Sequence, residues 1–328
     1  MNPSHRFRAA VAASVFLCLY TAGASHGEFS SLREALPAHA PGPDIIEHAG
    51  YTLRYSEPYE QAAWVAYILT AGHCAGTARR SGDFRPDTAV PTGSATPGDY
   101  RNSGYDRGHL APAGDMKWSV RAMSESFLMS NMSPMVREFN RGVWERLESR
   151  VREWANENGE VYVVVGPVLA DNLPTIGEDR VAVPRAFYKV ILDYRAPDYK
   201  GIGFIMPNAA SSKPIDVYAV PIDSVERATG IDFFPALPDS LERAIEGSLH
   251  PAAWGLSGRE IAMAPASSAG GSKTTDTSRP GAGGMKISVG TVVMVLAFII
   301  VVVFIIWLLV MALTGTLGFF GRGGRRRR

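Results

Sequence analysis

Hydrophobic residues along the chain form two long uncharged runs near its ends and a series of short runs between them. The short runs are rich in β-branched and aromatic residues and are bounded by Gly, Pro or charged residues, which is typical of strands. They cover residues 51–55, 62–70, 161–169, 186–194 and 201–207. These runs predict a sheet at the centre of the molecule.

A different period governs the segment that begins at Met135 and ends at Asn156. Its apolar residues recur at helical spacing, which predicts one long helix. Shorter helices are expected over residues 122–128 and inside the closing stretch 229–247. Strands before and after a helical insertion, with tight connections between the later strands, predict an α+β domain. We expect a mixed layered domain with a largely antiparallel central sheet.

The N-terminal uncharged run is typical of a targeting segment. Arg6 and Arg8 precede it, no acidic residue occurs in the first 27 positions, and small residues follow near Ala24. A basic start, an apolar middle and a small-residue end favour a secretory signal peptide cleaved near Ala24. A mitochondrial presequence is the alternative, because it is also basic and free of acidic residues.

The C-terminal uncharged run begins at Ile287 and ends at Leu313. At about 1.5 Å per residue, a helix of this length measures about 40 Å and exceeds the roughly 30 Å of a bilayer's hydrocarbon core. We therefore expect a single transmembrane helix. Arg322 and the four arginines at 325–328 follow it, so the positive-inside rule places the tail in the cytosol, or in the matrix for a mitochondrial protein. A lipid-anchor signal is less favoured, because such signals usually end in the apolar run.

These features divide the chain into five parts. The overall charge of +1 indicates no particular partner. Between domain and membrane, residues 265–284 consist mainly of Gly, Ser, Thr, Ala and Pro, which predicts a flexible tether. The expected parts are a targeting segment at 1–24, a folded domain at 44–255, a linker at 256–284, the membrane helix at 287–313 and a basic tail at 314–328.

The stretch YDRGHLAPAGDM, residues 105–116, carries the candidate chemistry. A polar surface turn would also account for its Asp and Gly residues. Hydrolysis of a phosphodiester, however, needs a base, a cation that neutralises charge, and a group that holds the phosphate. His109 can act as the base and Arg107 as a bidentate phosphate clamp. Mg²⁺ keeps most of its waters in proteins, so one amide oxygen on the long helix could hold it.

Three segments in this order resemble the signature blocks of a known family. DRGHLAPAGDMKWS (106–119), FLMSNMSP (127–134) and FNRGVWERLE (139–148) are similar to those of the non-specific DNA/RNA endonucleases, which are ββα-metal nucleases of the endonuclease G type. VYVVVGPVL, FYKVIL and TGIDFFP extend the resemblance over about residues 50–248. It implies a ββα-metal motif and metal-dependent cleavage of DNA and RNA, with Mg²⁺ or Mn²⁺, to 5′-phosphate and 3′-hydroxyl ends. It also leaves a homodimer open, although no interface signal stands out in the sequence.

The resemblance implies a role for each matching position. His109 corresponds to the general base, Asn140 to the single protein ligand of the metal, and Arg107 to the active-site arginine. Asn131 corresponds to an asparagine that lines the site, and Glu148 to an acid that hydrogen-bonds the metal's waters. Helical geometry agrees: at ~100° per residue, Asn140 and Glu148 differ by about 80° in direction. The alternatives are a helix N-cap for Asn140 and a solvated surface charge for Glu148.

An upstream arginine also contacts the phosphate in a bacterial member of the family. The polar stretch 77–104 offers Arg79, Arg80 and Arg85, and we favour Arg80. Asn131 also begins an N-glycosylation triplet, Asn-Met-Ser, and a sugar there would block the expected site. That conflict keeps the mitochondrial alternative open, with the domain facing the intermembrane space.

A membrane-anchored protein that binds nucleic acid or a protein partner without catalysis is the competing function. The presence of both His109 and Asn140 argues against it, because binding alone requires neither. We therefore expect a membrane-anchored nuclease whose domain lies on the non-cytosolic side, in the secretory pathway or at the cell surface.

Overall fold

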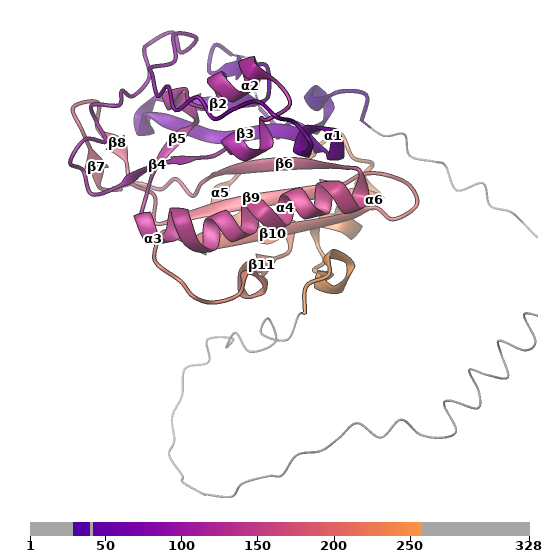
Figure 1. Ribbon diagram of the computed structural model, residues 1–328. Helices are drawn as coiled ribbons and strands as arrows, with labels where there is room; N and C mark the ends of the chain where they lie inside the picture. The colour runs from indigo at the N-terminus through magenta and orange to yellow at the C-terminus, as the bar shows by residue number, and fades with distance from the viewer. Residues whose placement is uncertain (1–28, 40–41, 258–328) are drawn as a thin grey trace, which may run out of the picture. The chain divides into compact units, whose positions relative to one another are not determined.

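The computed structural model describes residues 29–39 and 42–257 of the 328-residue chain (Figure 1). The predicted targeting segment, membrane helix and basic tail, and all but the first two residues of the predicted linker, lie outside these ranges. Among the helices within these ranges, none is long and apolar enough to cross a bilayer.

A seven-stranded sheet forms the centre of the domain, and all its neighbouring strands pair antiparallel. The predicted largely antiparallel sheet is therefore confirmed. All five predicted strands are present within two residues of their expected ends. In spatial order the strands are β1 (Ile45–Glu47), β2 (Thr52–Ser56), β3 (Gln61–Thr70), β6 (Glu160–Pro167), β9 (Ala186–Asp193), β10 (Lys200–Pro207) and β11 (Ala219–Val220).

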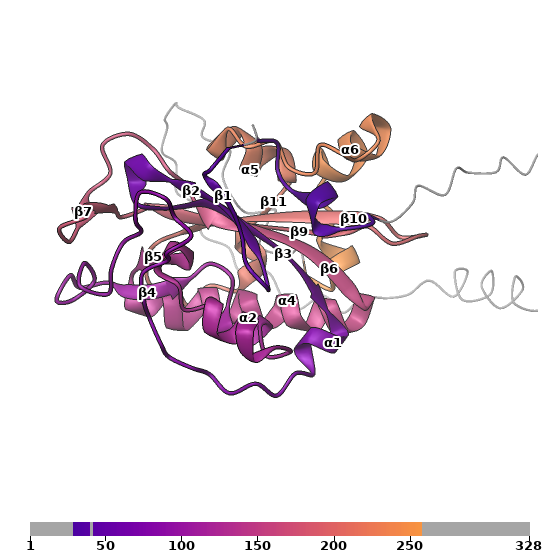
Figure 2. The same ribbon diagram turned by 90° about the horizontal axis from the view of Figure 1, so that it is seen from above.

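Both faces of the sheet are covered, which explains why its strands read as nearly continuous apolar runs. Helix α4 (Glu145–Asn158) lies on one face and contributes Leu147, Val151 and Trp154 to the core there. On the other face lie α5 (Ile222–Thr229) and α6 (Asp239–Glu246), as Figure 2 shows. Full burial of one aliphatic side chain, such as Leu147 or Val151, stabilises the fold by about 1.5 to 3 kcal/mol.

The remaining elements are short and were mostly not predicted from the sequence. The helix expected at 122–128 is α2 (Val120–Glu125). It begins two residues earlier than expected, because Ser119 caps it by accepting from the Ala122 N–H. Ala35 and Leu36, which precede the predicted domain start at residue 44, pack into the core on the α5 side. The other short elements are α1 (Ala71–Cys74), α2 (Val120–Glu125), the β7–β8 hairpin (Thr175–Ile176 and Val181–Ala182), and 3₁₀ turns η1 (Leu32–Ala35), η2 (Glu57–Tyr59), η3 (Ala113–Asp115), η4 (Met129–Asn131), η6 (Ile215–Tyr218) and η7 (Pro251–Trp254).

The DRGH stretch is a strand and not a surface turn. It forms β4 (Asp106–His109), which pairs antiparallel with β5 (Met132–Met135), so that His109 lies opposite Met132. Gly108 is required here, because a Cβ at this position would collide with the Met135 side chain. The β4–β5 pair followed by a helix has the arrangement that the ββα resemblance implies.

The helix after β5 differs from the single helix predicted from Met135. Residues up to Met135 belong to β5, so the helix starts with α3 (Arg137–Phe139). It continues as a π-helical turn, η5 (Asn140–Trp144), with a kink at Gly142 (φ −118°, ψ −107°), before α4 begins. A π-turn inside a helix is frequent at functional sites, since it rotates side chains away from the regular helical face.

Asn131 braces the loop that follows His109. Its side chain is fully buried, and its Oδ1 accepts from the Ala111 N–H at 2.9 Å. Its Nδ2 donates to the carbonyl oxygens of Ala111 at 3.0 Å and Ser126 at 2.9 Å. The prediction that Asn131 lines the site is therefore wrong: all its side-chain hydrogen-bonding groups face the protein backbone. The folded domain also has no room for a glycan at this position.

Substitution of Asn131 tests this bracing role. Asn131→Ala leaves buried backbone groups of Ala111 and Ser126 without partners, so it should lower the free energy of unfolding by about 3 kcal/mol. Urea denaturation measures the change, with Asn156→Ala on the exposed face of α4 as the control, expected within about 0.5 kcal/mol of wild type. Equal stability of the two variants would contradict the role.

Candidate active site

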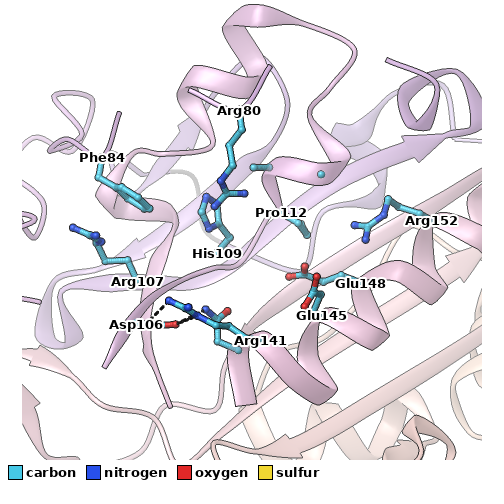
Figure 3. A pocket seen from close by; sticks show the side chains of 13 residues that line it. Arg80, Phe84, Asp106, Arg107, His109, Pro112, Arg141, Glu145, Glu148 and Arg152 are labelled. Carbon is cyan, nitrogen blue, oxygen red and sulfur yellow. Dashed lines mark hydrogen bonds and ion pairs between the residues drawn. The ribbon is translucent and has the colours of Figure 1, made fainter. Parts of the chain in front are cut away.

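A pocket of about 480 Å³ opens between β4, the loop after it and the first turns of the long helix (Figure 3). Five of the six residues predicted for the site line this pocket: Arg80, Arg107, His109, Asn140 and Glu148. They come from segments up to 68 positions apart in the sequence. Asn131 is the exception and lies behind the wall.

His109 ends β4, and its ring is 9% exposed. Phe127 meets it edge-on at 4.9 Å between ring centroids, and Phe84 lies at 5.8 Å. Burial first, and then the charges of Arg80 and Arg107, lower the pKa of His109 to about 3. Its Nε2 has no hydrogen-bond partner among the described residues. The imidazole is therefore neutral at physiological pH, and a general base at this position needs its pKa raised toward neutrality when the substrate is bound.

Two positively charged side chains, Arg80 and Arg107, line the pocket near His109. The guanidinium of Arg107 lies 4.2 Å from the centre of the Phe84 ring, and that of Arg80 lies 4.9 Å from the centre of the Phe127 ring. Figure 3 shows the Arg80 guanidinium next to the imidazole. Contact with an aromatic face holds an arginine in place without neutralising it. Both cations thus remain available for an anionic ligand, which would also weaken their effect on the pKa of His109.

The choice among the upstream arginines follows from their contacts. Arg85 donates to the Asp83 carboxylate at 2.7 Å and to the Ser124 carbonyl at 3.0 Å, so its charge is engaged elsewhere. Arg79 is exposed and does not line the pocket. Arg80 is the member of the group that reaches the pocket, as favoured from the sequence.

Asn140 lies in the π-turn, where Asp106 fixes its amide. Its Nδ2 donates to Asp106 Oδ2 at 3.3 Å, and Arg141 Nε donates to the same oxygen at 2.8 Å. Because the amine end is engaged, the amide Oδ1 is the end left to bind a cation. The helix-cap alternative is wrong, since the helix begins at Arg137 and Asn140 lies three residues inside it.

Two carboxylates, Glu145 and Glu148, lie side by side at the other end of the pocket (Figure 3). Burial raises the pKa of Glu148 to about 7, with Asp115 and Glu145 raising it further while Lys189 and Arg152 oppose the shift. Glu148 is half-buried and lines the pocket, so it does not lie on an open helix surface as the solvated-charge alternative assumes. A nearby cation would favour its ionised form.

Sequence reasoning missed Asp106, Glu145 and Arg152 as pocket residues. Arg152 donates to Asp115 Oδ1 at 2.9 Å, and Tyr67 donates to the other oxygen of that carboxylate at 2.9 Å. A signal was present: Glu145 and Arg152 lie three residues before and four after Glu148, on one face of a helix.

The donor set fits a hard divalent cation. Asn140 offers an amide oxygen, and Glu145 and Glu148 offer carboxylate oxygens, which are the ligands that Mg²⁺ and Mn²⁺ prefer. A cation that keeps most of its waters needs few direct protein ligands. Asn140 would hold the ion directly, and the two glutamates would hydrogen-bond its waters.

Known proteins are similar to this chain over most of the described domain. Residues 35–240 match the sequence model of the family described as DNA/RNA non-specific endonuclease. Mitochondrial endonuclease G of Bos taurus is 36% identical over 245 residues, which are 69% of this chain and 80% of that protein. The human endonuclease G is 38% identical over 216 residues, 60% of this chain and 73% of that protein.

Two further comparisons concern a shorter match and a solved structure. The mitochondrial nuclease EXOG of Danio rerio is 38% identical over 207 residues, 58% of this chain, and the chain spans 60% of that protein. A structure titled as the EndoG/EndoGI complex aligns with a TM-score of 0.58 and 35% identity, over 63% of this chain and 91% of the other. Because the family match covers more than half of its length, the chain belongs to the DNA/RNA non-specific endonuclease family.

Proposed function

We propose that this protein is a metal-dependent endonuclease that hydrolyses phosphodiester bonds of DNA and RNA to 5′-phosphate and 3′-hydroxyl ends. The observation that carries the proposal is a neutral, buried His109 beside two arginines, in the same pocket as Asn140 and Glu148. A site for binding alone would not need an unprotonated imidazole at that point. The related proteins named above are nucleases.

Each residue has a distinct task in the proposed reaction. Arg80 and Arg107 bind the non-bridging oxygens of the phosphate. His109 takes a proton from the water whose oxygen forms a bond to phosphorus, while the bond to the 3′-oxygen breaks. Asn140 would hold Mg²⁺ or Mn²⁺, and the bound ion would neutralise negative charge on the phosphate and on the leaving oxygen. The 3′-oxygen takes a proton from solvent, which gives the stated ends.

Broad substrate range follows from what the pocket offers. Arginine guanidinium groups and a bound cation recognise phosphate, which every nucleotide carries, and phosphate contacts hold no sequence information. Cleavage should accordingly vary little with sequence and fall with rising salt. A homodimer stays a prediction of the family resemblance.

We further propose that residues 287–313 anchor the nuclease in a membrane, with the domain on the non-cytosolic side. The names of the endonuclease G and EXOG relatives include the word mitochondrial, which supports the mitochondrial alternative. The secretory arrangement has the same orientation. The buried Asn131 no longer separates the two compartments, because a glycan has no place there in the folded domain.

The catalytic role of His109 can be tested with plasmid DNA and with RNA. His109→Ala should lower the cleavage rate by about 10² to 10⁴-fold, because the water loses its base. Chelation of the cation should abolish wild-type activity, and end-labelling should give 5′-phosphates. His250→Ala, at an exposed histidine outside the pocket, serves as the control and should cleave normally. The proposal would be refuted if His109→Ala, at matched stability, cleaved at the wild-type rate, or if the products carried 3′-phosphate ends. A wild-type protein that binds nucleic acid but never cleaves it would favour the binding alternative.

The cation can be tested through its pH dependence. Asn140→Ala should abolish the response of cleavage to Mg²⁺, whereas Glu148→Gln should weaken it less. With a pKa of about 7, Glu148 binds a proton in competition with the cation at lower pH. The apparent affinity of wild type for Mg²⁺ should therefore fall by up to about tenfold per pH unit below 7, and Glu148→Gln should lack this slope. An unchanged Mg²⁺ response in Asn140→Ala would place the ligand elsewhere.

The membrane anchor can be removed without touching the site. Deletion of residues 285–328 should release a soluble and fully active enzyme, because all pocket residues lie between 80 and 152. Protease added to sealed microsomes, which expose the cytosolic face of the membrane, should leave a tag on the domain intact. A tag cleaved from the cytosol would reverse the orientation, and lost activity on deletion would contradict a passive anchor.

A further inference from the structure

Three acidic side chains meet where α5 and α6 pack on the sheet. These two helices lie on the face of the sheet opposite α4 (Figure 2). Asp223 and Glu226 lie on α5, and Glu246 is the last residue of α6. One carboxylate oxygen from each lies within 4.8 Å of the others. The catalytic residues contribute nothing to this cluster, since they belong to β4, the upstream loop and the long helix.

Glu246 distinguishes this cluster from ordinary surface acids. Only 4% of the residue is exposed, and its Oε1 has no hydrogen-bond partner among the described residues. A buried carboxylate oxygen without a partner is costly, so such a group normally has a ligand or carries a proton. Glu226, in contrast, already accepts from the Phe233 N–H at 2.9 Å through its Oε1.

The surroundings add further negative charge. Burial first, and then Glu226, Glu242, Asp232 and Asp223, raise the pKa of Glu246 to about 9. The guanidinium of Arg227 approaches the cluster only at 4.0 Å from Asp223, and its own side chain is 69% exposed. An exposed pair at that separation compensates little. The cluster therefore favours a positively charged ligand.

The spacing suits a large divalent cation. Ca²⁺ binds oxygen at about 2.3 to 2.6 Å, so two oxygens on one ion can be at most about 5 Å apart. All three carboxylate oxygens fall within that limit. Mg²⁺ demands a smaller and nearly ideal octahedron, whereas Ca²⁺ accepts irregular sets completed by water.

We propose that Asp223, Glu226 and Glu246 form a second divalent-cation site, of the Ca²⁺ type, which clamps the end of α6 to α5. The bound ion would neutralise the buried Glu246 carboxylate, whose Oε1 has no hydrogen-bond partner among the described residues. Its role is structural: it stabilises the layer that covers the sheet on the side away from catalysis.

Calorimetric titration of the full chain with CaCl₂ tests the site. The titration uses Asn140→Ala protein, so that the proposed ligand in the active site is absent. Asn140→Ala is called the background protein and should bind Ca²⁺. The double variant with Glu246→Gln should not bind it. Glu242→Gln, one turn earlier on the same helix, makes the same change of charge outside the trio and should keep the binding. Asp223→Asn, at a more exposed position, should weaken it at least about tenfold and serves if Glu246→Gln does not fold.

Thermal unfolding of the same proteins provides a second readout. Ca²⁺ at about 100 times its Kd should raise Tm by about 5 to 10 °C in the background protein and in Glu242→Gln, but not in Glu246→Gln. An equal response in Glu246→Gln would overturn the proposal. Absence of Ca²⁺ binding in the Asn140→Ala protein would also overturn the proposal. If Glu246→Gln also stabilised that protein, a bound proton and not a cation would account for the buried Glu246 carboxylate. Nuclease activity enters neither measurement, so failure of the catalytic proposal would leave both readouts intact.

Discussion

The carboxylate of Asp106 joins the two halves of the active site. It lies at the start of β4 and accepts from Asn140 and Arg141 on the helix, 34 and 35 residues further along the chain. Arg137 lies 3.6 Å from its other oxygen. The strand that carries His109 is thereby held against the helical turn that carries Asn140. Without this contact, neither the direction of the Asn140 amide nor the local charge balance would be fixed.

The charges that have no ion-pair partner among the described residues are separated along the pocket. Arg152, which also lies near the glutamates, is paired with Asp115. Arg80 and Arg107 lie near His109, whereas Glu145 and Glu148 lie toward the opposite end (Figure 3). Scattered charges would pair with one another, as Arg85 does with Asp83. Separated charges instead leave one end for a phosphate and the other for a cation. The imidazole at the basic end is neutral, because burial first, and then the arginines that attract phosphate, disfavour a proton on His109.

Most of the sheet could be predicted from the sequence because both of its faces are buried. Strands such as β6 and β9 must then be apolar throughout, and that signal is local. The polar strand β4 gave no such signal, since its pairing with β5 depends on residues about 25 positions away. The π-turn was also hidden, because one glycine in a helical pattern does not specify the kink at Gly142.

Five of the six residues that motif matching proposed line one pocket, whereas the side chain of Asn131 points into the protein backbone. A motif identifies which residue occupies a position, not which way its side chain points. Direction depends on tertiary hydrogen bonds, such as those from Asn131 to Ala111 and Ser126.

The sequence also held one signal whose meaning only the fold reveals, the lysine inside the apolar strand FYKVIL. Lys189 is fully buried on β9, and its Nζ lies 4.6 Å from the centre of the Trp144 ring. Burial lowers its pKa, while the charges of Glu148 and Asp115 oppose that shift. Lys189 in turn opposes the raised pKa of Glu148. The charged forms of Glu148 and Lys189 therefore favour each other, so the interior of the sheet takes part in the electrostatics of the site.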